Sequence, residues 1–174
     1  METPKPDKRL ARIIKEYPSL DEKTKDMIDA IIRISKNDGS RGIYTMNKIV
    51  EALKKAGTFF IATEDGEQPR VRPFGAVLEY DGKPYLCTGN TKPCFAQMKA
   101  NPKVEISATY PDHTWLRLTA KVEPIDNDSI RAAMLEEYPE LKGMYHVGDG
   151  IFEVLEIKEA SGGIYSFVAE PVKL

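Results

Sequence analysis

A chain of 174 residues, 41% hydrophobic and 30% charged, is long enough to bury the core of one domain of ordinary size. Its formal net charge of -2 at pH 7 argues against general nucleic-acid binding, which requires a broad cationic surface. No apolar run approaches the length of a membrane span, and the charged first ten residues lack the apolar core of a signal peptide. We therefore expect a cytoplasmic protein that contacts neither nucleic acid nor membrane, with both of its cysteines as free thiols.

The first 44 residues are predicted to form a helical extension. Residues 7–16 fit a short helix that ends at Tyr17-Pro18, and residues 21–35 carry an apolar stripe at helical spacing. Residues 37–42 are rich in turn formers, which indicates a loop or linker. The domains are therefore expected to be this extension, residues 1–44, of unassigned purpose, and a core domain over residues 45–174.

The core domain is predicted to be mainly β with helices. Thr45 is a suitable cap for its first helix, and Gly57 is suited to end that helix. The predicted helices cover 46–55, 95–101 and 126–138, and the predicted strands cover 58–63, 70–80, 83–88, 104–110, 113–124, 152–157 and 164–168. Tight turns between most strands favour an antiparallel sheet, and closing it into a barrel would protect its edges.

The stretch over residues 69–92 carries the strongest functional signal. An Asp81-Gly82 pair between two apolar runs predicts a tight hairpin turn, because both turn positions require positive φ. If the residues that flank this turn pair with each other, the register continues until Arg72 lies opposite Thr91. Arg70 and Arg72 share a face because side chains alternate along a strand.

Cationic and hydroxyl side chains would therefore gather at the open end of this hairpin. The group comprises Arg70, Arg72, Thr88, Thr91 and Lys92. Helix-like sequence follows directly, so free backbone N–H groups would point at the same place. Arginine binds phosphate in a bidentate manner and lysine acts as a point charge, so the pattern predicts a site for a phosphate group.

Simpler interpretations remain open for these and other notable residues. The cations could be solvated strand-end charges paired with Glu64, Asp65 or Glu67. Trp115, the only tryptophan, could be a core or interface aromatic residue, or it could form a flat wall beside a ring-shaped ligand with Arg117 on the same face.

Acid–base catalysis finds no support in the sequence. The two histidines, His113 and His146, have no acidic partner at a defined spacing, and His146 lies in a loop that could line a pocket. No hydrolase, zinc-protease or P-loop motif is present.

Several short motifs occur in a defined order between residues 46 and 168. They are Phe60-Ile61-Ala62-Thr63, Pro69-Arg70-Val71-Arg72-Pro73-Phe74, Tyr85-Leu86-Cys87-Thr88 with Thr91-Lys92, Asn101-Pro102-Lys103-Val104, and Trp115-Leu116-Arg117-Leu118-Thr119-Ala120-Lys121-Val122. Together they resemble the pyridoxamine 5'-phosphate oxidase-like flavoproteins, the FMN-binding split barrels.

The resemblance implies a six-stranded antiparallel split barrel that forms a homodimer, with FMN in two grooves at the subunit interface. The residues that it implies for cofactor binding are Arg70, Lys92, Thr88 and Thr91 at the FMN phosphate, Val71, Arg72 and Pro73 along the isoalloxazine ring, and Trp115 and Arg117 at the flavin of the partner subunit. Members that oxidise pyridoxamine phosphate end in a segment rich in Trp and Arg. Residues 162–171 contain neither, so that activity is not expected here.

The leading hypothesis is an FMN-dependent oxidoreductase that passes electrons from reduced nicotinamide through FMN to a small acceptor such as a nitro compound or a quinone. The cofactor would carry the chemistry, which explains the lack of an acid–base pair, and Arg72 would stabilise the negative charge of reduced flavin. One alternative is a non-catalytic flavin-binding module for storage, sensing or electron shuttling. Another is a haem-binding split barrel with His146 as axial ligand.

Overall fold

The computed structural model describes Asp21 and residues 47–174. The helical extension predicted over residues 1–44 lies outside the described residues, except for Asp21. No helix in the described part is long and apolar enough to cross a membrane.

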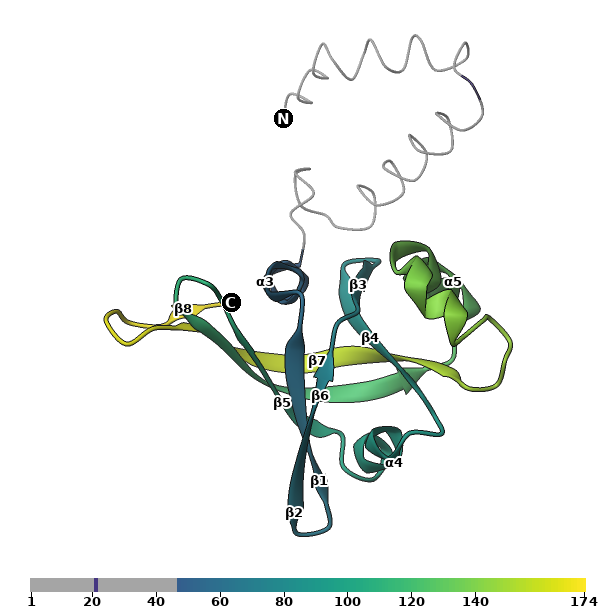
Figure 1. The fold of residues 1–174 in the computed structure, drawn as a ribbon, viewed down its shortest axis with the longest axis horizontal. Coiled ribbons are helices and arrows are strands. Elements are labelled where there is room, and N and C mark those ends of the chain that lie inside the picture. The colour runs from purple at the N-terminus through teal and green to yellow at the C-terminus, as the bar shows by residue number, and fades with distance from the viewer. Residues whose placement is uncertain (1–20, 22–46) are drawn as a thin grey trace, which may run out of the picture. The chain divides into compact units, whose positions relative to one another are not determined.

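The described chain is mainly antiparallel β-sheet with a few helices (Figure 1). The helices are α3 (Lys48–Ala56), α4 (Pro93–Ala100), α5 (Asp128–Glu137) and a short 3-10 helix, η2 (Pro139–Gly143). The strands are β1 (Phe59–Asp65), β2 (Gln68–Phe74), β3 (Val77–Tyr80), β4 (Lys83–Gly89), β5 (Lys103–Thr109), β6 (Trp115–Ile125), β7 (Phe152–Tyr165) and β8 (Val172–Lys173). The predicted helices are confirmed as α3, α4 and α5, with ends shifted by a few residues.

The strands form one curved sheet in the order β2-β1-β5-β6-β7-β4-β3, with β8 paired to β7. Every pairing is antiparallel, and β2 and β3, although adjacent in sequence, stand at the two ends of this order. The fold is therefore the expected split barrel, with eight strands rather than six among the described residues.

The hairpin around Asp81-Gly82 is confirmed, but only over part of its predicted length. The pairs from Tyr80↔Lys83 to Val77↔Leu86 have the expected register. Beyond them the chain turns away at Gly75-Ala76, and β2 pairs with β1 instead of β4. Arg72 therefore lies opposite Ile61, and the prediction that it lies opposite Thr91 is wrong.

The strand predicted over residues 70–80 is divided between two hairpins. A second tight turn at Gly66, where φ is 62°, folds β2 back along the whole of β1. The predicted strand is therefore split: its first part belongs to the β1–β2 hairpin and its last part to the β3–β4 hairpin.

The C-terminal strands also differ from expectation. The strands predicted over 152–157 and 164–168 are one strand, β7, that pairs with β6 around a bulge near Lys121. Gly162 and Gly163 lie inside this strand, where no side chain would fit. A Cβ at Gly162 would fall 2.0 Å from the Arg117 carbonyl oxygen, and a Cβ at Gly163 would fall 2.3 Å from the Val172 carbonyl oxygen. The glycines mark a close approach of neighbouring strands and not a turn.

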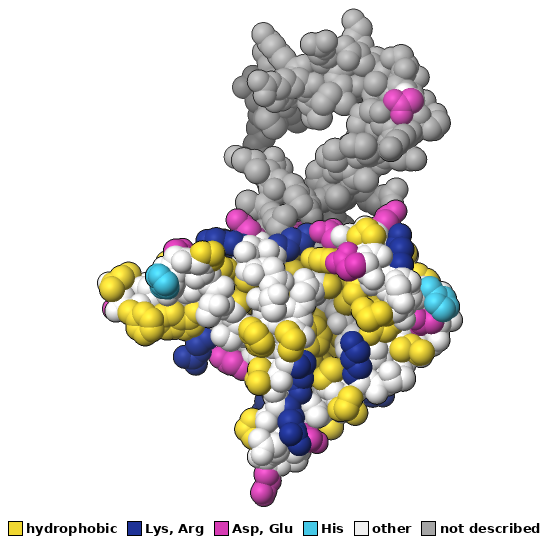
Figure 2. Space-filling model, in the orientation of Figure 1, with side chains coloured by type: hydrophobic (Ala, Val, Ile, Leu, Met, Phe, Trp, Pro, Cys, Tyr) yellow, Lys and Arg dark blue, Asp and Glu magenta, His cyan; other side chains and the backbone are white. Residues whose placement is uncertain are grey.

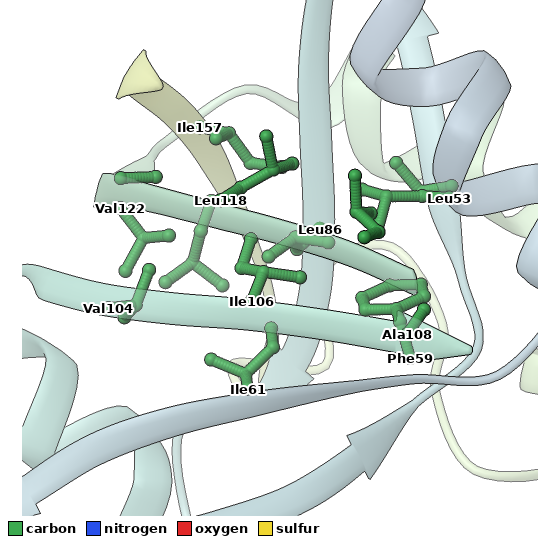
Figure 3. Close-up of a cluster of buried hydrophobic side chains, with 14 of the residues drawn as sticks. Leu53, Phe59, Ile61, Leu86, Val104, Ile106, Ala108, Leu118, Val122 and Ile157 are labelled. Carbon is green, nitrogen blue, oxygen red and sulfur yellow. The ribbon is translucent and has the colours of Figure 1, made fainter. Parts of the chain in front are cut away.

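Two apolar cores lie on either side of β4. The barrel interior is filled by side chains of one parity from β1, β5 and β6, with Leu53 of α3 closing one end (Figure 3). A second cluster lies between β3, β4, β7 and α5, and it includes Met134 and Phe152. Alternate residues of β4 face the two cores: Leu86 belongs to the first, and Tyr85 and Cys87 belong to the second.

The starts of helices α3 and α4 differ from the predicted positions. Asn47, not Thr45, is the residue that caps α3, because its Oδ1 accepts a hydrogen bond from the Ile49 N–H at 3.0 Å. Helix α4 begins at Pro93, earlier than predicted, since proline is well tolerated in the first turn of a helix.

Candidate functional site

Arg72 is held in place by a network on the inward face of β2. Its Nη1 donates hydrogen bonds to the carbonyl oxygen of Ile61 at 3.1 Å and to Thr63 Oγ1 at 2.7 Å. Its Nη2 donates to Gln97 Oε1 at 2.9 Å, and that oxygen also accepts from the Thr63 hydroxyl at 2.7 Å. The guanidinium is thus fixed from strand β1 and helix α4 together.

Sequence reasoning missed Gln97 and Thr63. One signal was available for Gln97, because it lies between the buried residues Cys94 and Met98 on the inner face of α4, where a polar side chain needs a partner. Thr63 is 4% exposed in a strand whose other inward residues are apolar.

Lys92 stands at the start of α4, where the chain leaves β4. It occupies the N-cap position, and no side chain caps this helix. Its Nζ lies 5.7 Å from the centre of the Tyr145 ring, and it forms no ion pair with any described carboxylate. Thr88, just before this turn, is 3% exposed, and its hydroxyl lies 3.6 Å from Cys94 Sγ.

Two hollows meet at these residues. The first, which we call the charged compartment, has a volume of about 510 Å³ and is lined by Asp65, Arg70, Val71, Arg72, Lys92, Pro93, Cys94 and Gln97. The second, which we call the apolar compartment, has a volume of about 190 Å³ and is lined by Arg72, Pro73, Phe74, Gly75, Ala76, Cys87, Thr88, Lys92, Cys94, Leu141, Met144 and Tyr145. Arg72, Lys92 and Cys94 line both, so the compartments adjoin.

The charges of this region are unevenly balanced. Arg70 Nε lies 3.1 Å from Asp65 Oδ2, so the interpretation of a paired strand-end charge is correct for Arg70. Neither Arg72 nor Lys92 has an acidic partner among the described residues, although Arg72 is half-buried. Lys and Arg side chains follow the β1–β2 hairpin in Figure 2, with acidic side chains at its tip. The site therefore carries positive charge that a bound anion would neutralise.

Burial also affects the one thiol that lines only the apolar compartment. Cys87 is 7% exposed, and this burial raises its pKa to about 12 despite the opposing effect of the Lys92 charge. Cys87 is thus an uncharged part of the wall at neutral pH, as expected for a buried free thiol.

A loop over residues 144–151 contributes its first two residues, Met144 and Tyr145, to the wall of the apolar compartment. The Asp149 carboxylate accepts hydrogen bonds from the backbone N–H groups of Phe152 and Ile151, both at 2.7 Å, and of His146 at 3.0 Å. Asn90, in the turn before Lys92, donates from Nδ2 to the carbonyl oxygen of Gly150 at 2.7 Å. The loop is therefore tied to the turn that carries Lys92.

Comparisons with known proteins show the family of the chain. A family model described as pyridoxamine 5'-phosphate oxidase matches residues 45–161. The chain belongs to the pyridoxamine 5'-phosphate oxidase-like family. A solved NimC/NimA family protein from Clostridium acetobutylicum is 49% identical, with a TM-score of 0.71 over 74% of this chain and 90% of that one. No protein with a curated description matches the chain.

More distant solved structures share the fold alone. An FMN-binding protein related to pyridoxamine 5'-phosphate oxidase, from Nostoc punctiforme, is 17% identical, with a TM-score of 0.56 over 71% of this chain and 84% of that one. A haem-binding protein from Mycobacterium smegmatis is also 17% identical, with a TM-score of 0.58 over 76% of this chain and 59% of that one.

The structure brings together most of the residues that the family resemblance implies. Those that line one or both compartments are Arg70, Val71, Arg72, Pro73, Thr88 and Lys92. Thr91 lies in the exposed turn beside them but lines neither compartment. Two residues that were not predicted also line the hollows, Gln97 in the charged compartment and Tyr145 in the apolar compartment.

Trp115 and Arg117 lie elsewhere in the chain. Trp115 pairs with Tyr165 at the last residue of β7, whereas Gly89, next to the compartments, pairs with Phe152 at its first. The Trp115 and Tyr165 rings stack with centres 6.1 Å apart, and Arg117 Nε lies 3.3 Å from Glu105 Oε1. Within one chain these two residues do not reach the compartments.

No metal site and no lining histidine occur in the described part of the chain. No group of three or more His, Cys, Asp or Glu side chains could hold a metal ion there. His146 is exposed on the 144–151 loop and lines neither compartment.

Proposed function

We propose that this protein binds FMN and acts as an FMN-dependent oxidoreductase, passing electrons from reduced nicotinamide to a small acceptor such as a nitro compound or a quinone. The observation that carries the proposal is that two cations without a described acidic partner, Arg72 and Lys92, line the same two compartments. Lys92, at the N-cap of α4, suits a phosphate group, and Arg72, held from the middle of that helix, suits the negative charge of a reduced ring.

The residues present fit the phosphate end of FMN. Lys92 can supply a point charge to the phosphate, and the amide Nε2 of Gln97 donates no hydrogen bond to any described residue while its side chain lines the charged compartment. Arg70 can serve as well, if it gives up part of its contact with Asp65. The hydroxyl of Thr88 is a weaker candidate, since it is buried against Cys94.

The ring end of the cofactor fits the edge of β2 between the two compartments. Val71, Arg72 and Pro73 provide this edge, and the fixed guanidinium of Arg72 would stabilise negative charge on a reduced ring. When bound, the flavin would supply the electron-transfer chemistry, and the protein would position it and tune it.

A homodimer is part of the proposal, because it explains residues that one chain leaves apart. The outward face of the sheet carries a cross-strand row of Pro73, Phe60, Ser107 and Arg117. Phe60 is 46% exposed, and Val71 on the same face is 68% exposed, which is typical of a surface that meets a partner. A second copy on this face would bring Arg117 towards the site of its neighbour.

The proposal includes a cytoplasmic location. It is supported by the two free thiols, Cys87 and Cys94, which fit a reducing compartment.

The test begins with the cofactor. Purified protein should carry a flavin absorbance, and Lys92→Ala should weaken FMN binding by about 10- to 150-fold, through loss of a charge-assisted hydrogen bond of about 1.5–3 kcal/mol. Lys99→Ala is the matched control, because Lys99 lies on the same helix but outside both compartments. Equal FMN affinity in the two variants would refute the phosphate assignment.

The catalytic part is tested on the loaded protein. Reduced nicotinamide should bleach the flavin spectrum, and a quinone or a nitroaromatic compound should restore it. A flavin that stays oxidised would leave the non-catalytic flavin-binding module as the function. A monomer that retains FMN tightly, measured by light scattering, would contradict the homodimer.

A further inference from the structure

Tyr145 has a hydroxyl that the fold does not use. The side chain is 7% exposed, and its ring stacks on Phe152 with centres 4.8 Å apart and planes inclined at 23°. Its hydroxyl forms no hydrogen bond with any described residue, yet the residue lines the apolar compartment. No buried polar side-chain atom among the described residues lacks a partner, so this unpaired oxygen is accessible from the compartment and available to a ligand.

The hydroxyl lies over the backbone of Gly89. A Cβ at Gly89 would be 3.1 Å from the Tyr145 hydroxyl oxygen and 3.3 Å from its ring. The φ of Gly89 is not positive, so the backbone there does not require glycine. The missing side chain leaves the space that the phenol occupies, beside the turn that carries Lys92.

The rest of the apolar compartment defines what such a ligand would be. Phe74, Ala76, Leu141 and Met144 offer an apolar lining, and at about 190 Å³ the hollow is much smaller than the charged compartment. A flat ring would bury its faces against these side chains, and an oxygen atom on its rim would meet the phenol.

We infer that the apolar compartment binds the electron acceptor, a planar ring that bears a carbonyl or nitro oxygen, and that Tyr145 donates a hydrogen bond to this oxygen. The inference rests on the proposed function, because it assigns the flavin ring to β2. Tyr145 reaches the compartment from a different wall, the loop after η2, so it is free to contact a second ligand. Leu141 and Met144, near the end of η2, then limit the size of the ring.

The experiment uses the FMN-loaded full chain and 1,4-naphthoquinone as the probe. Tyr145→Phe should raise the Kd of the quinone for the oxidised protein, and lower its kcat/KM, by about 3- to 10-fold, the loss of one neutral hydrogen bond. FMN content, flavin reduction by reduced nicotinamide and turnover with ferricyanide, which needs no hydrogen bond, should not change. Tyr80→Phe is the control, since it removes a phenol from β3 outside both compartments.

A second variant disturbs the hydrogen bond between Tyr145 and the quinone without removing the hydroxyl. Gly89→Ala should displace the phenol by a few tenths of an ångström and weaken quinone binding, while its effect on ferricyanide turnover should be nil. Wild-type quinone affinity in both variants would overturn the inference. Loss of FMN in Tyr145→Phe would also overturn it, because the hydroxyl would then serve the cofactor. Failure of the proposed function looks different, since wild-type protein would then lack FMN or leave it oxidised.

Discussion

The barrel interior and the two compartments share parts of β1 and β4 but are held together by different forces. Inside the barrel, Ile106 and Leu118 pair across β5 and β6 and are at most 1% exposed, so burial of apolar surface stabilises them. Around the compartments, Arg72 and the 144–151 loop are held by a few hydrogen bonds to named partners. A change in the first region should therefore affect the whole fold, and a change in the second should affect the ligand or the loop.

The largest effect should come from the barrel interior. Leu118→Ala should lower the free energy of unfolding by about 2–5 kcal/mol, because it leaves a cavity in a packed core. Chemical denaturation measures this. Val147→Ala, at an exposed position on the loop, should stay within about 0.5 kcal/mol of wild type. Equal losses in both variants would erase the distinction between the regions.

An intermediate effect should come from Gln97, which fixes Arg72 from helix α4. Gln97→Ala removes the acceptor of Nη2 and should weaken FMN binding by about 3- to 10-fold through a less ordered guanidinium. The midpoint of thermal unfolding should change little, since the side chain is only half-buried. Gln68→Ala, in the exposed part of β2, is the matched control. Unchanged FMN affinity in Gln97→Ala would show that Arg72 does not depend on this contact.

The smallest effect should be local and dependent on pH. Backbone hydrogen bonds, first from Phe152 and then from His146, lower the pKa of Asp149 from 3.8 to about 2. The carboxylate binds protons less readily in the folded state, so it stabilises the loop fully above about pH 4 and loses this effect as the pH falls towards 2.

Asp149→Asn should therefore increase hydrogen exchange in the 144–151 loop at pH 7 while leaving it unchanged in β5 and β6. Wild-type protein should show the same loosening only at strongly acidic pH. Identical loop exchange in the variant and the wild type at pH 7 would mean that other contacts, such as those of Asn90, hold the loop by themselves.

The sequence predicted the fold class and several elements because their signals are local. Asp81-Gly82 determines its own turn, and the register follows for as long as the two strands stay together. The register of the Asp81-Gly82 hairpin does not extend to Arg72, because Gly66 starts a competing hairpin. Only the closure of the barrel decides which of the two hairpins includes Arg72. At β7 the sequence predicts two strands, 152–157 and 164–168, that leave the glycine pair between them, whereas the contacts that require glycine come from the backbone of Arg117, distant in sequence, and of Val172.

The candidate site was predicted in part for similar reasons. The chemistry of Arg72 and Lys92 is visible in the sequence, since both residue types bind phosphate. Gln97 and Tyr145 take their place only through tertiary packing, one on the inner face of α4 and the other on a loop far along the chain. A residue whose hydroxyl lies over a distant glycine has no local signature.

Strand β4 is the shared wall of both apolar cores, and this bears on how a ligand enters. All of its residues from Pro84 to Gly89 are buried, and it pairs with β3 up to Leu86 and with β7 from Tyr85 onwards. Its amide hydrogens should therefore exchange far more slowly than those of the loops around it. The 144–151 loop, which a few hydrogen bonds hold in place, should exchange faster, so a ligand that requires the apolar compartment to widen would displace the loop and not the strand.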